Sequence, residues 1–67
     1  MIKSNVAKLM EEKKITVLAL SHETGLATET ITRARGDKIA KCQLETLEKI
    51  GAVLGVLIKD LFEEVSS

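Results

Sequence analysis

Six residues around Gly25 constrain the fold of this chain more than any other part of its sequence. They combine one glycine with small and apolar residues at fixed separations: Leu20, Ser21, Gly25, Leu26, Ile31 and Ala34. Glycine adopts a left-handed backbone without steric cost, which allows a sharp turn directly after a helix. Ser21 is small enough to let the two flanking helices approach closely. The spacing therefore predicts two short helices joined by a tight turn, with the second helix protruding from the surface.

Apolar residues recur at helical spacing before and after this pair of helices, and they predict further helices. Thr16 is a good N-cap residue for the helix that ends at Gly25. The expected helices cover about residues 2–13, 17–24, 28–35, 44–54 and 58–64, with a basic loop at 36–41. The alternating pattern of β-branched and aromatic residues that is typical of strands is missing. The sequence therefore predicts an all-α fold of five helices in one compact domain over residues 1–67.

Apolar residues at helical spacing are expected to form the core, and nothing else is expected of them. The predicted core residues are Leu20, Leu26, Ile31, Leu44, Leu47, Ile50, Leu54 and Leu61.

The charges of the chain are distributed unevenly. The net charge of the 67 residues is zero, which argues mildly against nucleic-acid binding, because Lys and Arg supply most of the affinity for phosphates. Residues 1–41, however, carry eight basic and five acidic side chains, whereas the remainder carries two basic and five acidic ones. One face of the protein can therefore attract phosphate, although scattered solvated charge is the simpler interpretation.

The sequence offers little that points to catalysis. Cys42 and His22 are single residues of their kinds and lie far apart, so no internal disulfide and no zinc pattern is expected. No paired carboxylates, phosphate-binding glycine loop or nucleophile with a base is present. We therefore expect no enzyme activity, no metal, no cofactor and no small-molecule ligand. No stretch reaches the roughly 18 apolar residues that a bilayer requires, so a cytoplasmic location without membrane contact is expected.

Three segments in order resemble the phage-repressor and Cro-like (XRE-type) helix-turn-helix DNA-binding family. They are residues 16–33, residues 44–56, and the triplet Asp60-Leu61-Phe62. The resemblance covers nearly the whole chain and places the helix-turn-helix at about residues 17–35. It implies a compact five-helix, lambda-repressor-like domain that binds double-stranded DNA at a palindromic operator, commonly as a dimer, and regulates transcription as a repressor-like or Cro-like protein, with repression and activation both open.

The resemblance also assigns roles to individual residues of the predicted third helix. Thr28, Glu29 and Arg33 match family positions that face base edges, and Thr32 lies on the same outer face. Arginine can hold guanine through O6 and N7, and threonine offers a hydroxyl and a methyl group. Glu29 has two interpretations: it accepts a hydrogen bond from cytosine N4, or it turns toward Arg33 and orients that side chain.

A further set of residues is expected to contact phosphates, which position a protein without reading sequence. The candidates are Thr16, Val17, Thr30, Arg35, Lys38 and Lys41. Val17 replaces a glutamine that is frequent in the family, so its contact would come from backbone N–H groups at the helix start. Met10 and Arg35 replace a frequent Arg–Glu ion pair. Met10 is expected in the core, and Arg35 is then either free for DNA or an ordinary solvated arginine.

Some apolar residues remain after the core is filled: Leu18, Val53, Leu57, Phe62 and Val65. One interpretation is a symmetric homodimer through Val53, Leu57, Phe62 and Val65, which would set two recognition helices about 34 Å apart. The other is that the small domain simply buries them. A second function also stays open, in which the same fold is a protein-interaction module, antitoxin-like or an anti-repressor partner. The zero net charge, Val17, Leu18 and Glu29 motivate that alternative.

Overall fold

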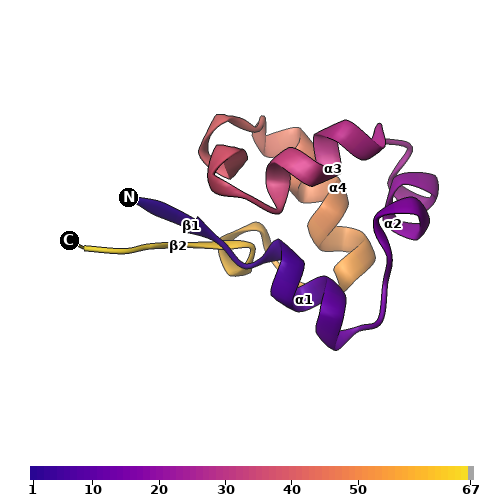
Figure 1. Cartoon of the computed structure of the whole chain (residues 1–67), viewed down its shortest axis with the longest axis horizontal. Helices are drawn as coiled ribbons and strands as arrows, with labels where there is room; N and C mark the ends of the chain where they lie inside the picture. Colours follow the sequence, from indigo (N-terminus) through magenta and orange to yellow (C-terminus); the bar gives the residue numbers. More distant parts are fainter. Residues whose placement is uncertain (67) are drawn as a thin grey trace.

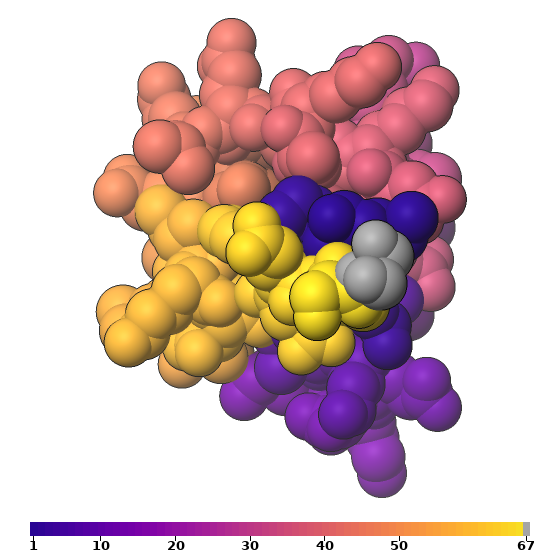
Figure 2. Space-filling view, turned by 90° about the vertical axis from the view of Figure 1, so that its left-hand side faces the viewer, coloured from indigo at the N-terminus to yellow at the C-terminus, as the bar shows by residue number. Residues whose placement is uncertain are grey.

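The computed structural model describes residues 1–66, which form four α-helices, two 3₁₀-helices and a two-stranded antiparallel sheet. In chain order they are β1 (Ile2–Ser4), α1 (Val6–Glu12), α2 (Val17–Thr24), α3 (Thr28–Ala34), η1 (Asp37–Lys41), α4 (Leu44–Leu54), η2 (Ile58–Asp60) and β2 (Phe62–Glu64). The helices cluster together, and the two strands lie side by side and extend away from them to one side (Figure 1). Viewed from that side, the indigo β1 segment and the yellow β2 segment lie next to each other (Figure 2).

The prediction of an all-α fold with five helices is wrong at both ends of the chain. The expected first helix at 2–13 is β1 followed by the shorter α1, and the expected last helix at 58–64 is η2 followed by β2. Ile2 pairs with Glu64, Lys3 with Glu63 and Ser4 with Phe62. These partners lie almost the whole chain apart, so local periodicity carries no signal for their pairing. The opposite charges of Lys3 and Glu63 favour this register.

The strands connect the start of α1 to the rest of the molecule. The Asn5 backbone N–H donates to the Leu61 carbonyl at 2.8 Å, and Ser4 Oγ donates to the Ala34 carbonyl at the end of α3. The Val6 N–H donates to the same Ser4 Oγ at 3.2 Å, which satisfies one of the free amides at the helix start. Ser4 in β1 therefore connects the start of α1 to the end of α3, the helix expected to bind DNA.

The predicted basic loop at 36–41 is also different, because its residues form η1. Ile39 in the middle of η1 is almost completely buried, and this contact with the core holds Lys38 and Lys41 on a defined turn instead of a free loop.

Ten apolar side chains form the buried core: Val6, Met10, Leu20, Ile31, Ala34, Ile39, Leu47, Ile50, Leu54 and Leu61. Met10 is buried as predicted. Leu26 packs against the core but is only half-buried. The prediction that Leu44 lies in the core is wrong, because its side chain is 68% exposed. Leu44 is the first residue of α4, and the buried stripe of that helix begins one turn later at Leu47.

Candidate nucleic-acid interface

The turn between α2 and α3 has the geometry that its sequence predicts. Thr16 Oγ1 accepts a hydrogen bond from the Ala19 N–H at 3.1 Å and so caps the start of α2. Gly25 ends the helix with a φ of 76°, in the left-handed region, and its N–H donates to the Ser21 carbonyl at 2.9 Å. The chain can therefore turn directly from α2 into α3.

The hydroxyl groups of Ser21 and Thr24 form hydrogen bonds with the backbone of Leu26, directly after Gly25. The Leu26 N–H donates to Thr24 Oγ1 at 3.2 Å, and Thr24 Oγ1 donates to the Leu20 carbonyl at 2.7 Å. Ser21 Oγ donates to the Leu26 carbonyl, so Ser21 is more than a small residue between two helices. Sequence reasoning missed Thr24, although a hydroxyl residue directly before a glycine at a helix end is a known signal for such bonding. Together these bonds fix the angle at which α3 leaves the turn.

The α3 helix divides into a buried face and an exposed face. Ile31 and Ala34 are completely buried, whereas the four predicted base-reading residues are all exposed: Thr28, Glu29, Thr32 and Arg33. Thr32 Oγ1 donates to the Thr28 carbonyl at 3.0 Å, within the helix. The exposed face of a helix about 10–12 Å in diameter is the part that can enter a major groove of similar width.

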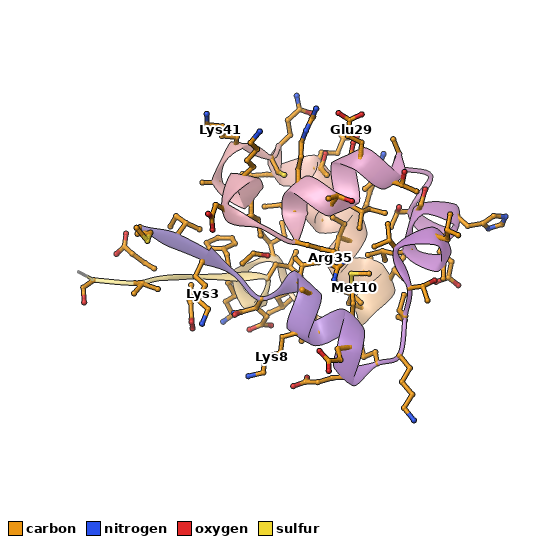
Figure 3. All side chains as sticks on the ribbon, viewed as in Figure 1. Lys3, Lys8, Met10, Glu29, Arg35 and Lys41 are labelled. Atoms are coloured by element: carbon orange, nitrogen blue, oxygen red, sulfur yellow. The ribbon has the colours of Figure 1, made fainter. Side chains whose placement is uncertain are left out.

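Glu29 and Arg33 form an ion pair on this exposed face. Glu29 Oε1 lies 2.8 Å from Arg33 Nη2, and the two side chains are 77% and 56% exposed. Glu29 points away from the body of the protein, toward the same side as Lys41 (Figure 3). Of the two interpretations of Glu29, the orientation of Arg33 is thus visible in the protein on its own, while contact with a base stays a prediction.

A groove of about 490 Å³ lies along one flank of α3, between that helix, η1 and the start of α4. Its lining residues are Thr30, Arg33, Lys38, Lys41, Cys42, Gln43 and Thr46. Three of the six predicted phosphate-binding residues are therefore together here, next to Arg33. Sequence reasoning missed Gln43 and Thr46, and the only signal for them is two polar residues at the start of a helix that follows a basic segment.

The other three predicted phosphate-binding residues gather on the opposite flank of α3. Thr16, Val17 and Arg35 line a second hollow together with Lys8, Met10 and the acidic Glu11. Arg35 lies beside Met10, away from the side to which Glu29 and Lys41 point (Figure 3). Within residues 1–66 Arg35 makes no ion pair. Lys8 on α1 was missed because α1 shows no motif of its own.

The apolar residues predicted to form a dimer interface are not gathered in one place. Leu57 is 62% exposed and lines a hollow with Ala52, Val56 and Ile58 at the end of α4. Phe62 instead lines a different apolar groove beside the sheet, together with Leu44. Val53 is half-buried against the core, and Val65 is 39% exposed. Leu18 on α2 is 74% exposed.

An α3 that follows a left-handed glycine turn and keeps its polar face exposed has the geometry of a DNA-binding helix-turn-helix. The family model of the Cro/C1-type HTH DNA-binding domain matches residues 5–66. This chain belongs to the Cro/C1-type helix-turn-helix DNA-binding family. A comparison with curated proteins gives no significant match. In this Cro/C1-type domain α2, the Gly25 turn and α3 have the arrangement of a helix-turn-helix.

Membership in the family confirms the resemblance seen in the sequence. It makes the protein a DNA-binding regulator in general terms. Within residues 1–66 no helix is both long enough and apolar enough to span a membrane.

Proposed function

We propose that this Cro/C1-type domain is a sequence-specific transcriptional repressor that places α3 in the major groove of double-stranded DNA. The observation that carries the proposal is the arrangement around α3. The helix presents Thr28, Glu29, Thr32 and Arg33 outward, and basic and hydroxyl side chains lie on both of its flanks. The two phosphate backbones that border a major groove would meet one flank each.

The outer face of α3 would supply the sequence specificity. Arg33 has five N–H donors in a planar fork, so it can donate to guanine O6 and N7 while one N–H remains with Glu29. Thr28 and Thr32 offer methyl groups for contact with thymine and hydroxyl groups for other base edges. The short Thr side chains also leave room for close approach of the helix to the bases.

The two flanks of α3 would supply most of the affinity. Thr30, Lys38 and Lys41 would contact one backbone, and Thr16, the Val17 backbone and Arg35 would contact the other. Such contacts release counterions and carry no sequence information. With a net charge of zero over the whole chain, this local concentration of basic groups is what makes binding to DNA favourable.

The domain would act as a homodimer on a palindromic operator. One α3 reads only a few base pairs, and a two-fold dimer doubles the contacts and sets half-sites about 34 Å apart. The exposed Leu57, with the apolar hollow beside it, supports an interface at the end of α4. Sedimentation of the Leu57→Glu variant tests this surface, with Leu44→Glu as a control of equal charge on the groove that contains Phe62. Loss of the dimer in the control alone would move the interface to that groove.

Selection of bound sequences from random double-stranded DNA tests the function itself. We expect an enriched palindrome with two half-sites about one helical turn apart. Enrichment of no sequence, at a salt concentration where the protein still binds DNA, would contradict sequence-specific recognition.

A protein-interaction module is the second candidate function, and one observation favours it. Leu18 is 74% exposed in the first turn of α2, next to Val17, where an apolar side chain gains nothing from DNA phosphates. In that case Leu18→Glu would abolish binding of a partner protein, and selection from random DNA would enrich nothing. An enriched palindrome that the Leu18→Glu variant still binds would contradict this alternative.

A further inference from the structure

Arg33 has an acidic neighbour on one side and a groove with basic residues on the other. On one side Glu29 Oε1 is 2.8 Å from Arg33 Nη2, on the exposed face of α3. On the other side Arg33 lines the groove that also contains Lys38 and Lys41. Within residues 1–66 neither lysine forms an ion pair, so Arg33 is the one cation of this groove that a carboxylate holds.

Arg33 would contact the DNA backbone if it lay in the groove, and a base edge if it stayed beside Glu29. A guanidinium binds a phosphate as readily as it binds the O6 and N7 acceptors of guanine. With Lys38 and Lys41 it would form a three-cation site for the DNA backbone, which is present in every sequence. Beside Glu29 it faces outward from α3, where base edges would lie.

We propose that Glu29 is a positioning residue that keeps Arg33 on a guanine and away from the phosphate backbone. The inference rests on the proposed function, since it requires α3 in the major groove. Glu29 lies one helical turn before Arg33, so the ion pair holds the guanidinium against the outer face of the helix. By keeping Arg33 away from phosphates, the same carboxylate lowers the affinity for DNA of unrelated sequence. Glu29 thus lowers the affinity for DNA in general and raises the preference for a half-site with a G·C pair opposite Arg33.

A second ion pair of the same kind provides a matched control. Glu45 Oε1 lies 3.8 Å from Lys49 Nζ on α4, with the same spacing along the helix and similar exposure. Glu45 lines neither of the two hollows beside α3. Glu29→Gln and Glu45→Gln therefore remove the same charge from an exposed helix, and only the first acts on Arg33.

The experiment measures binding of the full chain to the selected duplex and to a random duplex over a range of salt concentrations. We expect Glu29→Gln to bind the random duplex several-fold more tightly and to lose about tenfold of the preference for the selected duplex. We also expect the slope of log K against log salt to steepen by about 0.9, because Arg33 then contacts one more phosphate. Glu45→Gln should leave the preference and the slope unchanged.

The Arg33→Ala background separates positioning of Arg33 from simple loss of a negative charge. If Glu29 acts through Arg33, Glu29→Gln changes neither the slope nor the preference in that background. The inference would be overturned if Glu29→Gln changed the salt slope and the preference equally with and without Arg33. It would also be overturned if the Glu29→Gln variant kept the full wild-type preference for the selected duplex. A wild-type protein that prefers no duplex would instead overturn the proposed function, so the two failures are distinguishable.

Discussion

The backbone N–H of Leu26 donates a hydrogen bond of 3.2 Å to the side-chain oxygen of Thr24, across the turn that orients α3. Thr24 Oγ1 itself donates to the Leu20 carbonyl in α2. One hydroxyl group thus connects α2 to the turn that leads into α3, and removing it leaves the Leu26 amide without this partner.

Replacing Thr24 by valine keeps the shape of the side chain but removes the hydroxyl. We expect Thr24→Val to lower the free energy of unfolding by about 1–3 kcal/mol, since a partly buried N–H loses its acceptor. Thr24→Ser keeps the hydroxyl and should cost much less. Urea denaturation followed by circular dichroism measures both variants. Equal stability of Thr24→Val and the wild type would show that the bond does not hold the turn.

The lysines of η1 are expected to contribute affinity without specificity. Lys38→Gln and Lys41→Gln should each weaken binding by a similar factor on every duplex and reduce the slope of log K against log salt by about 1. Lys13→Gln, at the end of α1 and outside both hollows beside α3, is the control and should leave the slope unchanged. A change in which base pairs are preferred, or an equal effect of Lys13→Gln, would contradict phosphate contact by η1.

Thr16 offers a way to separate capping of α2 from contact with DNA. Its Oγ1 accepts from the Ala19 N–H, and aspartate and asparagine cap helices at least as well as threonine. Thr16→Asp and Thr16→Asn should therefore both keep the stability of the wild type. We expect only Thr16→Asp to weaken DNA binding, by about tenfold, because its charge faces a phosphate. Equal DNA affinity of the two variants would remove Thr16 from the interface.

Gly51 is needed for the approach of α4 to the chain that follows it. A Cβ atom at this position would lie 2.9 Å from the Val56 backbone oxygen. Alanine favours helix by about 1 kcal/mol over glycine, but this contact with backbone should outweigh the gain. We expect Gly51→Ala to lower the melting temperature by several degrees. In Gly36→Ala the atom nearest to the new Cβ, the Thr32 backbone oxygen, is 4.0 Å away, so that control should stay near the wild type.

The helix-turn-helix was predictable because its signals are local. Thr16 caps α2, Gly25 ends it, and the buried Ile31 and Ala34 define the inner face of α3. Each signal acts within a few residues of the structure that it specifies, so sequence alone places α2 and α3 within one or two residues.

The ends of the chain were not predictable in the same way. Residues 2–4 and 62–64 form strands only because each provides the partner of the other. Leu44 shows a related limit. Its spacing to Leu47 fits a buried helical stripe, but the core does not extend as far as Leu44. The division of the phosphate-binding candidates between two flanks of α3 likewise depends on how α1 and η1 pack, which no local pattern reports.

Arg33 on α3 is proposed to read a guanine in the major groove, and binding to a chemically modified duplex tests this contact most directly. Binding of the wild type and of Arg33→Ala is compared on the selected duplex and on the same duplex with single guanines replaced by 7-deazaguanine, which lacks the N7 acceptor. We predict that the wild type loses about 1–3 kcal/mol at one position of each half-site, while Arg33→Ala binds both duplexes equally. A wild type that tolerates the replacement at every guanine, or an Arg33→Ala variant that still discriminates, would contradict the account.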